Sequence, residues 1–295
     1  MSVLYTFTAN LLAETTAVFS MPKIGETVRA RSKALFKVGG KGVNVSMAAK
    51  MLGANTVAAI FPAGETGNRC KKYLDGKIEY FAVGLRGQTR EGLVCIDEKS
   101  GRETTFLGED IPVDGHSFDK MAEFLQKKIS ADDIFAFCGS FPGWERQYAD
   151  RLFEICKSAG AKICIDTYGE PLEDFSKKEI DLLKVNCAEF LALFKSPGEA
   201  FDGNLESAVA KFETPAKILA VTDGPRPAIF RAGGKIFKIS PPRVDEISAT
   251  GCGDIMLATF AVNAFMRGKS ARESAEEAIR AASKAASSRD RMRKF

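Results

Sequence analysis

Short runs of β-branched and aromatic residues alternate with amphipathic segments along most of the chain, which predicts an α/β fold. The predicted strands are Val3–Thr8, Thr56–Phe61, Ile134–Phe137, Lys162–Asp166, Leu182–Val185 and Ile218–Thr222, and the predicted helices include Val43–Leu52, Ser117–Ile129 and Tyr148–Lys157. In the second of these helices, Phe118, Met121 and Leu125 share one face. The strands are hydrophobic at nearly every position, which is typical of a parallel sheet buried on both faces.

Two stretches do not follow this alternation of strands and helices, because their apolar residues alternate with polar ones as in half-buried strands. They are Glu26–Val38 and Arg90–Phe106, and the second contains a turn at Glu98–Gly101. Together they predict a small antiparallel β-sheet inserted in the larger domain. Such a sheet, attached beside a glycine-rich loop, is suited to cover a substrate. We therefore expect one domain over residues 1–295, with a lid formed by about 24–38 and 88–107.

The composition is that of a globular protein, with 45% hydrophobic and 27% charged residues among 295. No apolar run approaches the length of a membrane span, and the first residues lack the features of a signal peptide. We therefore expect a cytoplasmic protein without a membrane partner. The net charge of +4, from 42 basic and 38 acidic residues, is too slight to predict binding of nucleic acid.

The seven cysteines stand singly and include no C-x-x-C pair. This pattern favours reduced, mostly buried thiols over disulfides. With a single histidine, His116, and no clustered cysteines, the chain offers little material for a zinc site. Any metal is therefore expected to be Mg²⁺ on oxygen ligands.

The strongest chemical signal is Ala249–Asp254 (Ala-Thr-Gly-Cys-Gly-Asp), which is followed by apolar residues typical of a buried helix. Glycines at a helix start leave backbone N–H groups uncovered, and these groups, together with the helix dipole, attract phosphoryl charge. The candidate donors are the amides of Gly251, Cys252 and Gly253. Asp254, in the first turn, can accept the proton of an attacking hydroxyl. Taken alone, the segment fits an ordinary glycine-rich helix start equally well.

A second glycine-rich segment, Val38–Asn44 (Val-Gly-Gly-Lys-Gly-Val-Asn), also precedes a predicted helix. Its glycines let the backbone approach a ligand closely, while Lys41 and Asn44 offer a charge and an amide that can bind hydroxyl groups. The G-x-x-x-x-G-K-[ST] spacing of a P-loop is missing, so a nucleotide site of that kind is disfavoured. By itself the segment is a weak signal, because glycine-rich turns between strand and helix are common in α/β folds.

Together the two segments resemble the signature regions of the pfkB, or ribokinase, family of carbohydrate kinases, including their separation of about two hundred residues. The resemblance runs from Tyr5 to about Ala286 and points to the branch of 1-phosphofructokinase, 6-phosphofructokinase and tagatose-6-phosphate kinase. The segments that carry this finer match are Thr6–Asn10, Phe61–Gly64, Thr89–Arg90, Gly139–Pro142 and Ile165–Glu170.

The resemblance implies a ribokinase-like, doubly wound, three-layer domain with a predominantly parallel sheet and a small antiparallel β-sheet lid. It also implies an ATP-dependent kinase that uses Mg²⁺ and phosphorylates a hydroxyl of a sugar. A sugar phosphate of the fructose-phosphate or tagatose-phosphate type is the favoured acceptor.

The resemblance further implies roles for single residues. It assigns Glu14, Gly39, Gly40, Lys41, Asn44, Arg90 and Ser140 to the acceptor side, and Lys184, Asn186, Thr222, Gly224, Gly251 and Gly253 to the nucleotide side. Arg90 would meet a phosphate already on the acceptor, because a guanidinium matches phosphate geometry. Asn186 and Glu189 form an N-x-x-E element that would hold Mg²⁺ mostly through water, although Glu189 could instead be an ordinary first-turn residue.

Several positions depart from the family pattern. Glu14 stands where similar kinases carry an aspartate that clamps the sugar, and Cys252 stands where alanine is usual. These changes lie mainly on the acceptor side and leave two alternatives open: a kinase for a nucleoside or another non-sugar alcohol, and a sugar-binding protein that has lost turnover. Asp166 ends a strand near the expected cleft, and the sequence leaves open whether it acts in the site or supports the loop.

The predicted lid would also expose apolar residues such as Phe36 and Val94 if its faces were left uncovered. Open sheet faces usually find a partner, because apolar surface exposed to water is unfavourable. We therefore expect a homodimer in which two lids pack against each other.

Overall fold

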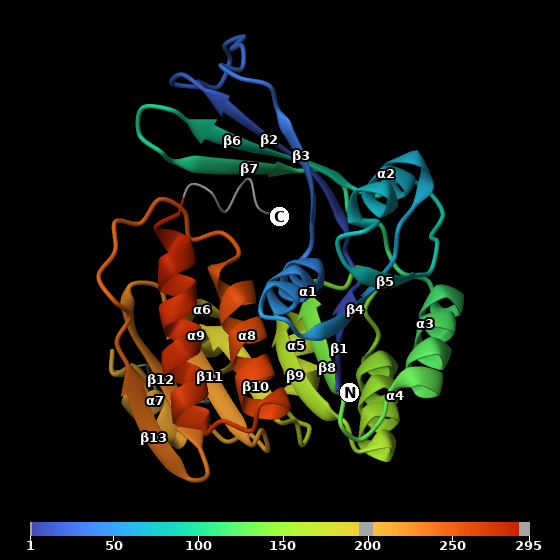
Figure 1. Ribbon diagram of the computed structural model, residues 1–295, viewed down its shortest axis with the longest axis vertical. Helices are drawn as coiled ribbons and strands as arrows, with labels where there is room; N and C mark the ends of the chain where they lie inside the picture. The colour runs from blue at the N-terminus through green and yellow to red at the C-terminus, as the bar shows by residue number, and fades with distance from the viewer. Residues whose placement is uncertain (1, 195–202, 289–295) are drawn as a thin grey trace.

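The computed structural model describes residues 2–194 and 203–288, and its main element is a nine-stranded sheet (Figure 1). The strand order is β13-β12-β11-β10-β9-β8-β1-β4-β5. Neighbours from β11 to β5 are parallel, and β12 and β13 add an antiparallel edge. The strands are β1 (Val3–Thr8), β4 (Asn55–Ile60), β5 (Glu79–Ala82), β8 (Ile134–Gly139), β9 (Lys162–Thr167), β10 (Leu182–Asn186), β11 (Ile218–Asp223), β12 (Arg226–Ala232) and β13 (Lys235–Ile239). The predicted parallel sheet is confirmed.

Strand β8 shows why these strands are hydrophobic without alternation. Phe135 and Phe137 belong to the core on one face of the sheet, whereas Ile134 and Ala136 belong to the core on the other. Successive side chains of a strand point to opposite faces, so a strand that is covered on both sides must be apolar throughout.

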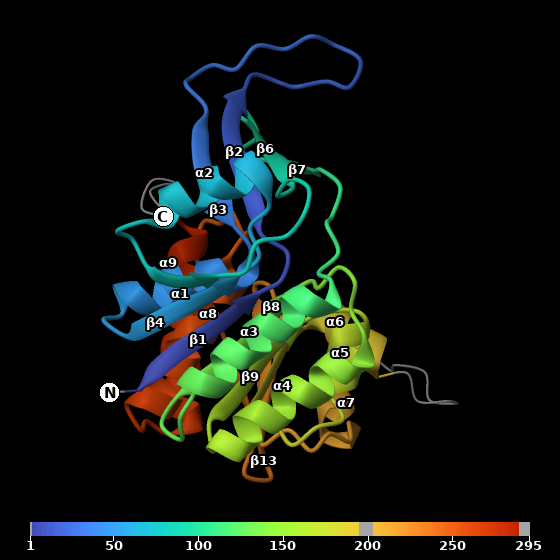
Figure 2. The ribbon, with the colours of Figure 1, turned by 90° about the vertical axis from the view of Figure 1, so that its right-hand side faces the viewer.

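Helices cover both faces of the large sheet and complete the predicted three layers (Figure 2). One face carries α1 (Lys41–Met51), α2 (Gly64–Leu74), α8 (Cys252–Ala261), which continues into the π-helix η1 (Val262–Met266), and α9 (Ala271–Ala286). The other face carries α3 (Gly115–Lys128), α4 (Arg146–Ala159), α5 (Glu170–Phe175), α6 (Cys187–Leu193) and α7 (Leu205–Lys211). The doubly wound α/β architecture is therefore confirmed.

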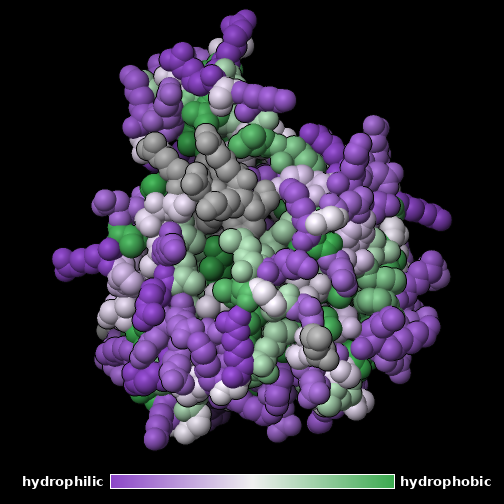
Figure 3. Space-filling view, viewed as in Figure 1, coloured by the Kyte–Doolittle hydropathy of each residue, from purple (hydrophilic) through white to green (hydrophobic). Residues whose placement is uncertain are grey.

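A separate four-stranded sheet, here called the lid, stands over one end of the larger part (Figure 1). Its order is β3-β2-β6-β7, with β2 (Leu12–Phe19), β3 (Leu35–Gly39), β6 (Glu91–Asp97) and β7 (Glu103–Leu107). The hairpin turn between β6 and β7 includes the predicted Glu98–Gly101. In the space-filling view of Figure 3, hydrophobic side chains show on the lid and again on the larger part below it.

The lid differs from the prediction in two ways. Residues 26–34 form no strand, and the strand β2 was not foreseen, because Thr15, Thr16 and Ala17 weaken its apolar alternation. The lid is also mixed rather than antiparallel, since β2 and β6 run parallel. That pairing joins segments almost eighty residues apart, so no local pattern indicates its direction.

Two expectations from composition can be compared with the described residues. Five of the seven cysteines are buried, as predicted, namely Cys70, Cys95, Cys138, Cys156 and Cys164. Within residues 2–194 and 203–288, no helix has both the length and the apolar character needed to cross a membrane.

Candidate active site

A cavity of about 910 Å³ lies between the lid and the carboxyl ends of the central strands. The carboxyl ends of parallel strands meet at one edge of a sheet, so residues distant in sequence converge there. Every residue assigned to the catalytic turn, the acceptor or the nucleotide lines this cavity, namely Glu14, Gly39, Gly40, Lys41, Asn44, Arg90, Ser140, Lys184, Asn186, Thr222, Gly224, Gly251, Cys252, Gly253 and Asp254. Glu189 lies behind this lining and contacts it through Lys41.

Helix α8 begins at the cavity with the tight turn that the sequence predicts. Gly251 is its N-cap and has a left-handed backbone, with φ of 71°, which glycine adopts without strain. The N–H of Cys252 donates to the carbonyl of Ala249 over 3.2 Å, so this candidate phosphate donor already has a partner within the turn. Gly253 lets a cation approach, because a Cβ atom there would lie 2.8 Å from Nζ of Lys184.

The two glycine-rich segments meet through a hydrogen bond. Nδ2 of Asn44, on α1, donates to Oδ2 of Asp254, on α8, over 2.7 Å. Both helices begin at the same edge of the sheet and pack side by side. The bond therefore fixes the direction of the Asp254 carboxylate, and Asp254 lines the cavity.

Asp254 lies in an environment that disfavours its charge. The residue is only 5% exposed, and burial is the main reason why its pKa is raised to about 6, with the negative charge of Asp166 adding to the rise. The hydrogen bond from Asn44 and the charges of Lys184 and Lys41 act in the opposite direction. A carboxylate with a pKa near neutrality can accept a proton and release it again.

A buried carboxylate, Asp166, holds two lysines beside the cavity. Its Oδ1 lies 2.7 Å from Nζ of Lys41, and its Oδ2 lies 2.7 Å from Nζ of Lys184. Burial alone would raise the pKa of Asp166, but the two lysines outweigh it and hold the pKa below its usual value. Burial likewise lowers the pKa of Lys41, but the charges of Asp166 and Glu189 raise it by more. The directions of these two shifts favour a charged Asp166 and a charged Lys41.

Asn186 and Glu189 form the N-cap of α6 through a reciprocal capping box. The N–H of Glu189 donates to Oδ1 of Asn186 over 2.9 Å, and the N–H of Asn186 donates to Oε2 of Glu189 over 2.8 Å. Oε1 of Glu189 lies 3.7 Å from Nζ of Lys41. No group of three or more His, Cys, Asp or Glu side chains in the described ranges could hold a metal ion directly. Oxygen groups of this kind are ligands that Mg²⁺ prefers, and they would meet the ion mostly through its water shell.

The acceptor end of the cavity contains a polar network under the lid. Asn10 donates from Nδ2 to Oγ of Ser140 over 2.8 Å and to Oδ1 of Asp110 over 3.0 Å. Nη1 of Arg90 lies 2.7 Å from the same oxygen of Asp110. The loop before α1 approaches this end closely, because at Gly40 a Cβ atom would lie 2.6 Å from Cγ2 of Thr8.

Glu14 projects from strand β2 of the lid. Its Oε1 accepts a hydrogen bond from Oγ1 of Thr16 over 3.1 Å, and its Oε2 lies close to Gly39 on the neighbouring strand. A flexible, partly exposed carboxylate in this position can reach a hydroxyl group of a ligand in the cavity.

The opposite end of the cavity is formed by the turn between β11 and β12. Oγ1 of Thr222 donates to the carbonyl of Val185 over 3.4 Å, which fastens this turn to β10. Arg226 makes two hydrogen bonds, of 2.6 and 2.7 Å, to the carboxylate of Asp223. The turn thus presents Thr222 and Gly224 at the rim, with the adjacent charges already paired.

Two acidic residues that bond to the surroundings of the cavity could not be identified from the sequence. Glu103, on β7 of the lid, accepts hydrogen bonds from Oγ of Ser248 over 2.8 Å and from Oγ1 of Thr250 over 3.0 Å. Asp110 follows the lid and pairs with Arg90. Both acidic residues lie in polar stretches, where no spacing distinguishes them from solvated carboxylates. Glu103 joins the lid directly to the turn that carries Gly251.

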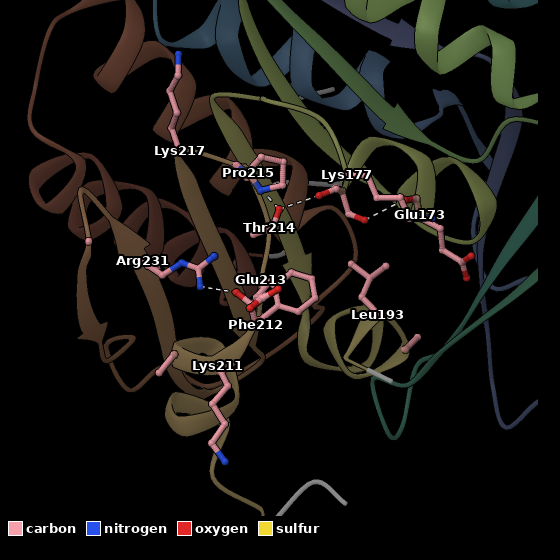
Figure 4. A pocket seen from close by; sticks show the side chains of 15 residues that line it. Glu173, Lys177, Leu193, Lys211, Phe212, Glu213, Thr214, Pro215, Lys217 and Arg231 are labelled. Atoms are coloured by element: carbon pink, nitrogen blue, oxygen red, sulfur yellow. Dashed lines mark hydrogen bonds between the residues drawn. The ribbon is translucent and has the colours of Figure 1, made fainter. Parts of the chain in front are cut away.

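Figure 4 shows a second cavity, of about 980 Å³, near the amino ends of β10 and β11. There Nη1 of Arg231 donates to the carbonyls of Val209 and Phe212 over 3.0 and 2.6 Å, so the guanidinium fastens the loop that leads to β11. None of the residues assigned from the sequence lines this cavity. Although this cavity is slightly larger than the first, no residue of the two glycine-rich segments lines it.

Known proteins resemble this chain in sequence and in fold. The model of the pfkB family carbohydrate kinases matches residues 12–291. The chain is 27% identical over 241 residues to a 1-phosphofructokinase from Borreliella burgdorferi, covering 81% of this chain and 77% of that protein.

Solved structures of phosphofructokinase-2 from Escherichia coli have a similar fold. The complex with fructose-6-phosphate has a TM-score of 0.86 at 23% identity, over 100% of this chain and 98% of that one. The tetrameric inhibited form has a TM-score of 0.87 at 23% identity, with the same coverage.

The raised pKa of Asp254 predicts how turnover depends on pH. A general base must be ionised, and a pKa of about 6 means that Asp254 is increasingly protonated as the pH falls below that value. The ratio kcat/KM, which reports ionisation of the free enzyme, should therefore fall about tenfold per pH unit below about 6 and level off above about 7. Steady-state kinetics between pH 5 and 8, with nucleotide affinity measured separately at each pH, would test this. A ratio kcat/KM that stays constant down to pH 5 would contradict it.

Proposed function

The chain belongs to the pfkB family of carbohydrate kinases, and from this premise we propose that it phosphorylates a sugar phosphate of the fructose-phosphate or tagatose-phosphate type with ATP. The observation that carries the proposal is the placement of Asp254. This buried carboxylate lies at the start of a glycine-rich helix and faces a cavity that the Gly39–Asn44 loop also lines. A base and a set of amide donors at one helix entrance suit phosphoryl transfer.

In this mechanism Asp254 orients the acceptor hydroxyl and accepts its proton as the oxygen attacks the terminal phosphorus. Asn44 holds the carboxylate in place through its 2.7 Å hydrogen bond. The amides of Gly251 and Gly253 and the ammonium groups of Lys41 and Lys184 stabilise negative charge on the transferring group. Asn186 and Glu189 would hold a Mg²⁺ ion, mostly through water, and the ion would supply charge that neutralises the nucleotide phosphates. Thr222 and Gly224 contact the nucleotide on its far side.

The lid excludes water that would otherwise accept the phosphoryl group. Val94, Thr105 and Leu107 line the cavity from the lid, and Glu103 ties the lid to the catalytic turn. Residues 1–295 thus function as one ribokinase-like domain whose lid closes over the acceptor. Glu14, Gly39 and Gly40 bind hydroxyl groups of the acceptor. Arg90 and Ser140 lie near its phosphate, so the acceptor is bound from both sides.

Replacing Asp254 with asparagine tests the base. Asp254→Asn should lower the maximal rate by about 10² to 10⁴, because it removes the proton acceptor, with little change in ATP affinity. Burial already favours the uncharged form of Asp254, so the amide should not lower the melting temperature. Asp245→Asn, at an exposed position outside the cavity lining, is the control and should retain activity. Near-normal turnover in Asp254→Asn would remove the residue from this role.

The acceptor class is tested by substitution of Arg90. A charge-assisted bond to phosphate is worth about 1.5–3 kcal/mol, so Arg90→Ala should raise the KM for a phosphorylated acceptor about tenfold to a hundredfold. The maximal rate should change little. Arg86→Ala, an exposed arginine of the same loop, is the control. ADP release would be measured over fructose, its 1- and 6-phosphates, tagatose 6-phosphate and a set of nucleosides.

The same panel separates the alternatives. A preference for an unphosphorylated nucleoside or alcohol, with no effect of Arg90→Ala, would contradict the sugar-phosphate proposal. Thermal stabilisation by a sugar without ADP release would instead indicate a binding protein that has lost turnover.

We also propose a homodimer formed through the lid. The two residues from which exposure was expected are covered, since Val94 is only 5% exposed and Phe36 packs edge-on against Tyr73. Other apolar residues of the lid that do not line the cavity are exposed, however, with Phe106 at 55% and Leu35 at 44%. Apolar surface of this kind favours association with a second copy.

Solution scattering should therefore give the mass of a dimer, and Phe106→Glu should shift that mass toward a monomer. Met51→Glu provides a matched control, because Met51 is 64% exposed at the end of α1, outside the lid. A monomeric mass for the unmodified chain at micromolar concentration would contradict the proposed dimer.

A further inference from the structure

Arg90 and Asp110 form an ion pair at the acceptor end of the cavity. Nη1 of Arg90 lies 2.7 Å from Oδ1 of Asp110, and the same oxygen accepts a hydrogen bond from Asn10 over 3.0 Å. Arg90 and Asn10 line the cavity, and Asp110 stands beside them on the segment between β7 and α3. The Asp110 carboxylate therefore already pairs with part of the Arg90 guanidinium, a group that is suited to bind an anionic ligand.

The pair leaves one donor of the Arg90 side chain without a partner. Its Nε atom is buried and has no hydrogen-bond partner. A buried donor on a charged group is costly when it is left unpaired. The Asp110 side chain is 48% exposed, whereas that of Arg90 is 14% exposed. Asp110 can therefore turn toward solvent more easily than Arg90 can, and a new anion could satisfy the guanidinium more fully.

We propose that Asp110 determines acceptor specificity as an internal counter-ion of Arg90, which a phosphorylated acceptor must displace. The role rests on the proposed function, in which Arg90 binds the acceptor phosphate. A phosphate would compete with Asp110 for the same guanidinium, and the two anions would repel each other. A neutral acceptor leaves the pair intact and meets a subsite without net charge. Asp110 thus lowers the affinity for anionic acceptors and leaves that for neutral ones unchanged.

The test measures ligand affinity of the full-length chain by titration calorimetry without ATP, with inorganic phosphate, fructose 6-phosphate and fructose as probes. Asp110→Asn keeps the size of the side chain and an oxygen that can accept from Asn10 and Arg90, but removes the charge. Partly exposed ion pairs contribute up to about 1 kcal/mol, so both phosphate compounds should bind about fivefold more tightly. The affinity for fructose should not change.

Two controls separate this role from a general effect of charge. Glu109→Gln removes the same charge from the adjacent exposed residue and should alter phosphate affinity by less than about twofold. In an Arg90→Ala background, Asp110→Asn should have no effect, because the competition no longer exists. A fivefold gain that appears only when Arg90 is present supports the proposal.

Unchanged or weaker binding of both phosphate compounds in Asp110→Asn would overturn it, as would an equal gain in the Arg90→Ala background. Weaker binding would mean that Asp110 orients Arg90 toward the ligand instead of competing with it. Turnover is measured separately. If the affinities change as expected but no sugar phosphate is phosphorylated, the proposed function fails while the competition between Asp110 and phosphate stands.

Discussion

The site depends on one buried carboxylate, that of Asp166, which lies 2.7 Å from each of two lysine ammonium groups. A single charge would not remain ionised at this depth, because removal from water disfavours it. Here the opposite charges of the carboxylate and the lysines stabilise one another. Since Lys41 belongs to α1, Lys184 to β10 and Asp166 to β9, the cluster also sets how these elements meet at the edge of the sheet. The arrangement directs positive charge to the place where phosphates would lie.

The same cluster governs the protonation of Asp254. Asp166 raises the pKa of Asp254, whereas the two lysines lower it. After burial, Asp166 has the largest influence on this pKa, and Asp166 is itself paired with the two lysines. The protonation of Asp254 and the charges of the two lysines are therefore not independent features. Both rest on the convergence of parallel strands and on the packing of α1 against α8, which brings Asn44 to Asp254.

The lid is joined to the larger part by acidic residues whose partners line the cavity or belong to the catalytic turn. Glu103 accepts hydrogen bonds from Ser248 and Thr250, close to Gly251, while Asp110 pairs with Arg90 at the acceptor end. Both contacts are partly exposed and can break without disturbing a core. The lid can therefore respond to a ligand while the sheet beneath it, apolar on both faces, remains fixed.

The α/β layering could be predicted from the amino-acid pattern, because continuous apolar strands and amphipathic helices are local patterns, and every strand predicted for the large sheet lies within two residues of its observed bounds. The same pattern indicated Asp254 and the segment Gly39–Asn44, which line one cavity, since glycines beside a helix start leave a local signature. The folded chain was needed to show that Asn44 binds Asp254, that Asp166 holds two lysines, and that β2 runs parallel to β6. These contacts join residues between about eighteen and two hundred and ten positions apart. They depend on side-chain directions and strand order, which are set when the sheet assembles and leave no trace in neighbouring residues.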